Sequence, residues 1–257
     1  MKFLGRLPRL YHRDTLRLHD YSLSPSGQLP AAPPSVSWGA TAESKMLPSQ
    51  GWGMMLNDQE GDCVWAAAGH SIESWTANAG NIYVPTDADI QTGYESTGFI
   101  PGNASTDNGT VITQALQYWR DTGISGHKIV GWAEFDTTNE QEWQFVIATF
   151  GSAFAGCVIR QQDMDNFDSG TIWSPSNGTV LGGHGIVLTD YDFSTASLVT
   201  WGKRVQACWS WVTQACDEGY APITADWIES QGVSPSGLTV SQLQADLGYF
   251  NPAIGHA

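Results

Sequence analysis

The chain is poor in basic residues: 11 Lys and Arg stand against 26 Asp and Glu in 257 residues, a formal net charge of −15. Because phosphate binding needs a basic surface, this balance excludes nucleic acid as the main partner. The sequence also lacks the roughly 18 consecutive apolar residues of a membrane-spanning helix, so no membrane contact is expected. Its N-terminus has no apolar run of about 7–15 residues, which a secretory signal needs. We therefore expect a cytoplasmic location.

Cysteine is scarce as well, with four residues in the chain. So few cysteines do not make a disulfide scaffold, and we expect reduced thiols. Cys208 and Cys216 fall on an apparent helix, too far apart along it to bridge. No CxxC pair suggests zinc, and the loop with Asp163, Asp165 and Asp168 lacks the spacing of a calcium loop. The sequence predicts neither a metal nor a cofactor.

Hydrophobic residues make up 41% of the chain and include 12 Trp, which is enough for a large core. Residues 1–36 differ from the rest, because they are basic and their second half is rich in proline. We therefore divide the chain into an N-terminal arm, 1–36, and a single domain of two lobes, 37–257. The arm has three interpretations: a partly disordered leader, a segment that lies on the body or on an assembly partner, or a short propeptide that covers the functional cleft.

The hydrophobic pattern places helices in the first half and antiparallel strands in the second. Helices are predicted over residues 62–77, 87–94, 111–120 and 140–150, and strands over 128–135 and 153–160. A β-hairpin is predicted from 184–191 and 197–201, followed by a Trp-rich helix over 204–216 and a short helix over 239–247. Helices and strands do not alternate along the chain, so the order indicates an α+β fold.

The stretch from Asn57 to His70 places a cysteine at the start of a helix. Gly61 supplies a turn, Asp62 is a typical N-cap residue, and the alanine-rich sequence after Cys63 favours a helix. In the first turn a thiol faces unpaired N–H groups and the positive end of the helix dipole, which lower its pKa. Cys63 is therefore the candidate nucleophile, and the alternative is a small buried helix residue.

His184 is the candidate base, because it stands between glycines at the mouth of an apolar strand. A cysteine on a helix and a distant histidine on a strand are the usual nucleophile and base. His70 lies on the same helix face as Cys63 but about 10 Å along the axis, so we interpret it as structural. Asp190 is assigned a turn or surface role, and the pair Asp217–Glu218 a solvated or capping role.

Four segments in this order resemble the papain-like cysteine peptidases. They are Asp62–Ala66 at the nucleophile, 107–123 at the second helix, His184–Val187 at the base strand and 198–202 at the next strand. The stretch 52–63 is similar to papain-like proteins of bacteria and their phages. The resemblance implies an α+β fold in which a helical half, with the nucleophile helix, packs on an antiparallel sheet or barrel half.

The resemblance also implies roles, with two departures from the family pattern. Where the family has an Asn that orients the base, the sequence has Val199 or Thr200, and only the threonine can accept a hydrogen bond from the imidazole. Where the family has its oxyanion Gln, the sequence has Asn57, a shorter amide that can still donate. Trp201 is expected to shield the base from water. No cofactor is implied.

These residues predict a thiol hydrolase that acts on peptide or amide bonds of a peptide or protein substrate. Cys63 attacks the carbonyl carbon, and His184 serves first as base and then as acid. Asn57 and the Cys63 N–H hold the oxyanion, while Thr200 orients the imidazole. A cell-wall amidase or a transpeptidase would use the same groups. The alternative is a weakly active or inactive papain-like interaction protein, such as a virion component docked through residues 1–36.

Overall fold

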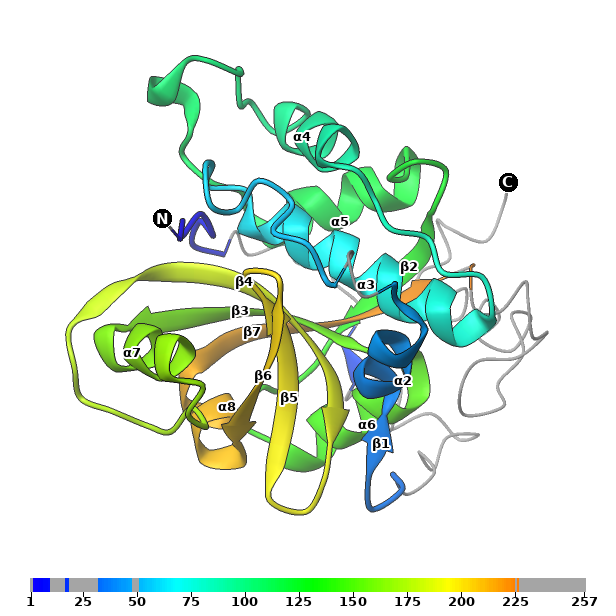
Figure 1. Ribbon diagram of the computed structural model, residues 1–257, viewed down its shortest axis with the longest axis vertical. Helices are drawn as coiled ribbons and strands as arrows, with labels where there is room; N and C mark the ends of the chain where they lie inside the picture. Colours follow the sequence, from blue (N-terminus) through cyan, green and yellow to red (C-terminus); the bar gives the residue numbers. More distant parts are fainter. Residues whose placement is uncertain (1, 10–16, 19–31, 48–50, 225, 227–257) are drawn as a thin grey trace.

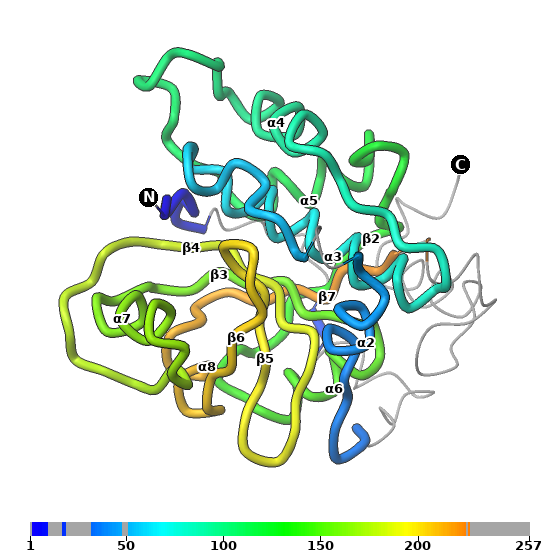
Figure 2. Tube along the Cα trace, in the orientation of Figure 1, coloured from blue at the N-terminus to red at the C-terminus, as the bar shows by residue number. Residues whose placement is uncertain are grey.

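The computed structural model describes residues 2–9, 17–18, 32–47, 51–224 and 226, which form two lobes (Figure 1). A helical lobe occupies the upper part of the view, and an antiparallel sheet with its own helices occupies the lower part. The dark-blue N-terminal segment lies at the boundary between them, as the chain trace also shows (Figure 2). Within the described residues, no helix is long and apolar enough to cross a membrane.

The helical lobe is built on α3 (Cys63–Ala79), which is buried along almost its whole length. Its buried residues are mainly apolar but include polar ones such as His70, Ser71 and Glu73, and their burial places the helix inside its lobe. Around it pack two further helices, α4 (Asp87–Glu95) and α5 (Ile112–Asp121), with the short 3-10 helix η1 (Ala104–Thr106) between them in sequence. Gly80, with a φ of 107°, ends α3 in the left-handed conformation that favours glycine.

The second lobe is built on an antiparallel sheet whose strands follow the order β2-β7-β3-β4-β5-β6, with β1 paired to β4. Its strands are β1 (Val36–Ser37), β2 (Ile129–Glu134), β3 (Ala153–Arg160), β4 (Val180–Tyr191), β5 (Thr195–Thr200), β6 (Lys203–Cys208) and β7 (Cys216–Thr224). Most of β3 and the last two thirds of β4, from His184 on, are buried, which explains their largely apolar sequences. They form the centre of the sheet, and β4 carries His184.

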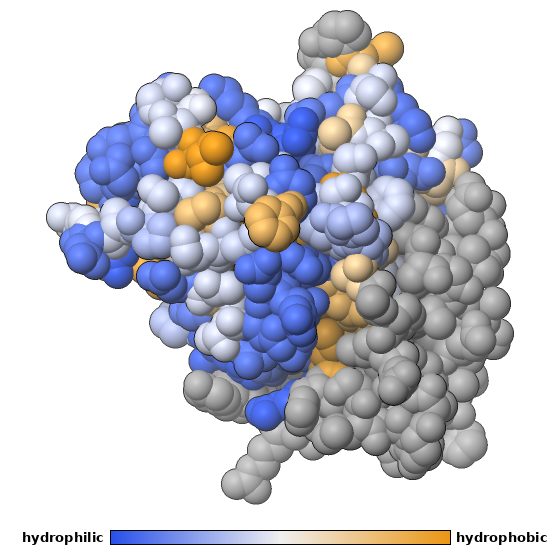
Figure 3. Space-filling model, turned by 90° about the horizontal axis from the view of Figure 1, so that it is seen from below, coloured by the Kyte–Doolittle hydropathy of each residue, from blue (hydrophilic) through white to orange (hydrophobic). Residues whose placement is uncertain are grey.

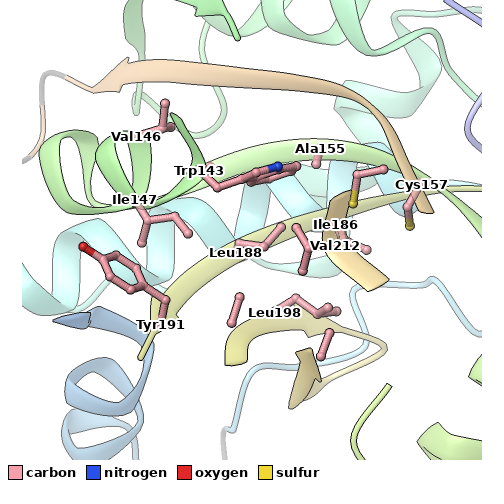
Figure 4. Packing of buried hydrophobic residues seen from close by; sticks show 14 of the residues in the cluster. Trp143, Val146, Ile147, Ala155, Cys157, Ile186, Leu188, Tyr191, Leu198 and Val212 are labelled. Carbon is pink, nitrogen blue, oxygen red and sulfur yellow. The ribbon is translucent and has the colours of Figure 1, made fainter. Parts of the chain in front are cut away.

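Four helices accompany the sheet: α2 (Trp38–Lys45), α6 (Glu140–Phe150), α7 (Gln161–Ser169) and α8 (Trp209–Ala215). The α6 side chains Trp143 and Ile147 pack with Ile186 and Leu188 of β4 in the core (Figure 4). Burial of side chains of this size contributes about 1.5–3 kcal/mol each, so this core holds β4 firmly in place. Seen from below, the described surface is mainly hydrophilic, with apolar residues in small patches (Figure 3).

The two lobes meet where the N-terminal end of α3 crosses β4. At this crossing, a Cβ added to Gly185 would lie 2.9 Å from the Cα of Val64. Only glycine allows the helix backbone to approach the strand so closely. The glycine that follows His184 therefore brings Cys63, the first residue of α3, next to the histidine strand.

The α+β fold and most elements agree with the sequence predictions, and the strand 153–160 has the predicted bounds. The helix predicted over 204–216 is partly wrong: residues 203–208 form β6, and only Trp209–Ala215 is helical. Residues 161–169, expected as a loop, form α7, and α2 was not predicted because only Gly39 and Ala42 in it are buried. The helix predicted over 239–247 lies outside the described residues.

Candidate active site

Cys63 begins α3, and its thiol is enclosed by backbone from two other parts of the chain. Its Sγ atom accepts the N–H of Gly185 at 3.2 Å and the N–H of Gly5 at 3.3 Å. The residue is 1% exposed. The N-terminal arm therefore reaches the candidate nucleophile and closes it off from solvent.

The predicted low pKa of Cys63 is wrong for this closed arrangement. Burial raises the pKa of the thiol to about 12, outweighing the two N–H groups that lower it. Nor does Asp62 cap the helix with its side chain, and burial raises the pKa of this carboxyl well above its usual value. The helix start favours a thiolate only when water can reach it, and here burial disfavours the charged form more strongly.

His184 lies on β4, opposite Cys157 of β3. Its Nε2 lies 2.6 Å from Thr200 Oγ1, whereas its Nδ1 is buried and has no hydrogen-bond partner among the residues that the structure describes. Burial, with smaller effects from the charges of His70 and Arg6, lowers the pKa of His184 to about 3. In the closed site the imidazole is therefore neutral.

Trp201 covers one face of this imidazole. The two rings stack with centroids 4.2 Å apart and an interplanar angle of 21°. Trp201 has a φ of 44° and Gly202 a φ of 70°, and together they form the two-residue turn between Thr200 and Lys203. Two positive φ values match the twist of a tight hairpin, so the turn itself presents the indole to His184.

Asn57 lies on the helical side of the site and is buried. Its Nδ2 lies 3.3 Å from the carbonyl of Glu60 and 3.4 Å from the carbonyl of Phe3. The same Phe3 carbonyl lies 3.4 Å from Trp201 Nε1. A peptide carbonyl of the N-terminal segment thus joins Asn57 to the tryptophan that stacks on the candidate base.

Residues 2–9 form a strap between the two lobes, held by main-chain hydrogen bonds. On the helical side, the N–H of Phe3 donates to Asn57 O at 3.1 Å, and Thr110 pairs with both Gly5 O (2.6 Å) and the N–H of Leu7 (2.9 Å). On the sheet side, the N–H of Arg6 donates to Gly183 O at 3.2 Å. The strap therefore binds as an extended peptide binds a sheet edge.

Gly5 is the point of closest approach between the strap and the helical lobe. A Cβ at this position would lie 1.7 Å from the carbonyl oxygen of Gly61. Gly109 is equally constrained, because its Cβ would lie 1.8 Å from the carbonyl oxygen of Gly5. No side chain fits at position 5 while the strap is seated.

Three basic residues of the strap make ion pairs with the sheet lobe. Arg6 pairs with Glu218 at 2.7 Å and with Asp217 at 2.9 Å. Lys2 pairs with Asp168, and Arg9 pairs with Glu134. The solvated or capping role predicted for Asp217–Glu218 is wrong for Glu218, which is buried on β7 beneath Arg6.

His70 and Asp190, two further residues considered in the sequence analysis, are buried and hydrogen-bonded to the backbone. His70 is buried with Nε2 3.2 Å from Gly53 O, and burial lowers its pKa to about 4. Asp190, expected in a turn or at the surface, is instead buried and accepts the N–H of Ala40. Among the described residues, no cluster of three metal-ligating side chains occurs.

The structure brings Cys63, His184, Asn57 and Thr200 to one place, and it adds a strap that the sequence suggested only as one of three interpretations of residues 1–36. The strap residues Gly5 and Arg6 and their partner Glu218 were not predicted. One signal was present in the sequence: a basic segment precedes a strongly acidic body. That contrast favours contact between the two, but it does not say which acidic residues take part.

No protein-family model matches the sequence, and no curated protein does. The structure is similar to xylellain, a cysteine protease from Xylella fastidiosa, with a TM-score of 0.63 and 13% identity over 87% of this chain and 97% of that one. It is also similar to procathepsin B S9 from Trypanosoma congolense, with a TM-score of 0.57 and 10% identity over 86% of each chain. For digestive procathepsin L2 from Tenebrio molitor the TM-score is 0.56, with 14% identity over 86% of this chain and 78% of that one. The chain therefore has the fold of the papain-like cysteine proteases.

Proposed function

We propose that this protein is a thiol hydrolase of peptide or amide bonds, with Cys63 as nucleophile and His184 as base. The observation that carries the proposal is that the two imidazole nitrogens of His184 have different surroundings. With Nε2–H donating to Thr200 Oγ1 at 2.6 Å, the lone pair of the unpartnered Nδ1 is free to take the thiol proton. Cys63 lies beside the His184 strand, since its Sγ accepts the N–H of Gly185, the residue that follows His184.

The oxyanion donors follow from the place of Asn57. Its amide nitrogen already faces a peptide carbonyl, that of Phe3, at 3.4 Å. During hydrolysis this amide and the Cys63 N–H would stabilise the negative charge that develops on the substrate carbonyl oxygen. The thiolate attacks the carbonyl carbon, and the protonated imidazole then gives its proton to the leaving amine. Water releases the acyl group in the second half of the reaction.

The strap holds this hydrolase in an inactive form. It buries the thiol, and it presents the N–H of Gly5 to Sγ at 3.3 Å. A sulfur that accepts an N–H lies on the hydrogen side of that amide, whereas attack requires an approach over the face of a carbonyl group. The strap thus occupies the site without being cleaved in this arrangement. Two of the similar structures are proenzymes, procathepsin B and procathepsin L2.

The test compares the full-length wild type with a Gly5→Leu variant. Because no side chain fits at position 5, this substitution should unseat the strap and leave the lobes intact. We expect the variant to hydrolyse fluorescently labelled casein at least about tenfold faster than wild type, and a second substitution, Cys63→Ala, to remove this activity. Unchanged hydrolysis after Cys63→Ala would refute the proposal. So would an inactive Gly5→Leu variant whose Cys63 is open to alkylation.

The alternative of an interaction protein docked through its arm is not favoured, because residues 2–9 contact the chain's own site. Binding of an assembly partner through other parts of residues 1–36 stays a prediction, as does the cytoplasmic or virion-associated location.

A further inference from the structure

The Arg6 side chain is buried in a site made by the sheet lobe, which we call the Arg6 site. Its guanidinium donates from Nη1 to Glu218 Oε1 at 2.7 Å and from Nη2 to Asp217 at 2.9 Å. The side chain of Arg6 is 6% exposed, that of Glu218 1% and that of Asp217 53%. One carboxylate therefore lies at the base of the site and the other at its rim.

Two glycines make room for this side chain. A Cβ on Gly156 of β3 would lie 2.6 Å from Arg6 Cδ and 2.8 Å from Glu218, and a Cβ on Gly183 of β4 would lie 3.0 Å from Arg6 Nε. The hydroxyl of Tyr220 donates to the other oxygen of Glu218 at 2.9 Å and fixes the carboxylate. The sheet lobe thus supplies a shaped, anionic recess beside the site of Cys63 and His184.

When the strap leaves, the recess loses its cation. Glu218 then keeps Tyr220 as its hydrogen-bond partner but has no positive charge beside it. Two neighbouring carboxylates that both bound Arg6 are left unpaired, so the open site should favour a cationic ligand that restores the pairing. A planar guanidinium with several N–H donors can bridge two carboxylates, whereas a lysine ammonium is a single, strongly hydrated point charge.

We infer that the Arg6 site is a substrate subsite that selects an arginine side chain, and that the strap holds the site closed by placing its own arginine there. This inference rests on the proposed function, because it names the class of peptide that the hydrolase takes. The net charge of −15 agrees with it, since an acidic protein attracts basic peptides to its surface.

Binding is measured first, in a way that does not depend on hydrolysis. The protein is the full-length chain with Gly5→Leu and Cys63→Ala, so that the strap is unseated and bound peptide is not consumed. The probes are two fluorescent peptides with the sequence of residues 2–9, one with arginine and one with citrulline at position 6. Citrulline keeps the shape of arginine and lacks its charge. We expect anisotropy titrations to give at least a tenfold lower Kd for the arginine peptide.

Two substitutions assign this preference to the site. Glu218→Gln should abolish the preference for arginine over citrulline, and Asp217→Asn, at the exposed rim, should weaken it without burying an unpaired group. Asp121→Asn, which makes the same charge change where Asp121 pairs with Arg120, is the matched control and should leave the preference intact. Equal binding of both peptides, or a preference that survives both Glu218→Gln and Asp217→Asn, would overturn the inference.

Hydrolysis separates this inference from the proposed function. The Gly5→Leu variant with Cys63 intact is given fluorogenic peptide amides in which one arginine is moved from position to position, with citrulline counterparts. A higher kcat/KM for arginine at one position, lost in Glu218→Gln, supports the subsite. Hydrolysis with no arginine preference overturns the subsite alone. Preferential arginine binding without any hydrolysis supports the site as a binding site and refutes the hydrolase.

Discussion

The two walls that enclose the strap hold it in different ways. We call the helical wall the residues around Asn57, Cys63 and Thr110, and the sheet wall those around His184 and Glu218. The helical wall binds the strap through main-chain atoms: three of its hydrogen bonds join backbone groups of Asn57 and Thr110 to the strap. The sheet wall makes one main-chain hydrogen bond, from the N–H of Arg6 to Gly183 O, and binds mainly through side-chain charge, with Arg6, Lys2 and Arg9 each paired to a carboxylate.

This difference separates two tasks that a peptide site must perform. Main-chain pairing accepts almost any sequence, because every residue except proline carries the same N–H and C=O groups. Buried charge pairing discriminates, because a mismatched side chain leaves a carboxylate without its partner. If the protein binds peptides as proposed, we expect the helical wall to position a peptide and the sheet wall to select it. The chemistry is divided as well, since the helical wall carries the thiol and the sheet wall carries the imidazole.

The largest expected effect comes from a substitution in the sheet wall that removes its imidazole. His184→Ala in the Gly5→Leu background removes the base, and we expect kcat/KM for peptide hydrolysis to fall by about 10²–10⁴-fold. The same variant should bind the arginine peptide with unchanged affinity, because Glu218 is intact. The measurement is initial hydrolysis rate together with peptide anisotropy. Retained hydrolysis would show that the imidazole is not the base.

The second prediction concerns the pH dependence of strap closure. It involves one titratable group in each wall, His184 in the sheet wall and Cys63 in the helical wall. Burial in the closed site lowers the pKa of His184 to about 3, and we expect opening to return it towards its ordinary value of about 6.5, so the closed form should lose stability as pH falls from about 6.5 towards 3. Burial in the closed site raises the pKa of Cys63 to about 12, and we expect opening to return it towards about 8.5, so the closed form should also lose stability as pH rises from about 8.5 towards 12. We expect the strap to be most firmly seated between about pH 6.5 and 8.5.

This pH dependence is measured by the rate of Cys63 modification with 2,2′-dithiodipyridine, which stays reactive in acid. Mass spectrometry assigns the modified cysteine, since Cys208 is also partly exposed. The ratio of the wild-type rate to that of Gly5→Leu reports the open fraction at each pH and should rise by up to about tenfold per unit below pH 6.5. A ratio that stays constant from pH 7 to pH 4 would contradict the prediction.

The smallest expected effect comes from removing a single hydroxyl group of the sheet wall, that of Thr200. Thr200→Val keeps the shape of the side chain but removes the hydroxyl that lies 2.6 Å from His184 Nε2. A net hydrogen-bond contribution of about 1 kcal/mol corresponds to a fall in kcat of roughly five- to tenfold in the Gly5→Leu background. Thr200→Asn, which restores a side-chain acceptor, is the companion variant and should lose less. Equal losses in both variants would mean that Thr200 acts by packing alone.

Local sequence patterns predicted the elements that carry the site. The strand 153–160 and the helix that begins near Cys63 were found because their apolar residues are contiguous or regularly spaced. The helix α2 was not predicted, because its two buried residues, Gly39 and Ala42, are small and do not form an apolar stripe in the sequence. Secondary structure was thus predictable wherever burial is extensive enough to mark the sequence.

The residues of the candidate site could be named from the sequence, but its closed state could not be predicted. Cys63 and His184 were named from their local motifs, and Asn57 and Thr200 from the resemblance to the papain-like peptidases. The partner of Glu218 could not, because Arg6 lies 212 positions away in the sequence and no local pattern links the two. The thiol pKa was misjudged for the same reason: a helix start is a local feature, whereas burial by the strap is a contact between distant parts of the chain.

The turn between β5 and β6 has a consequence for how this site can diversify. The hydroxyl that lies 2.6 Å from the imidazole Nε2 and the indole that stacks on the imidazole ring come from consecutive residues, Thr200 and Trp201. An insertion or deletion in the turn would displace both at once, whereas an exchange of hydroxyl for amide at position 200 leaves the rest of the turn unchanged. In related sequences we therefore expect substitutions at position 200, whereas the two-residue length of this turn should stay the same.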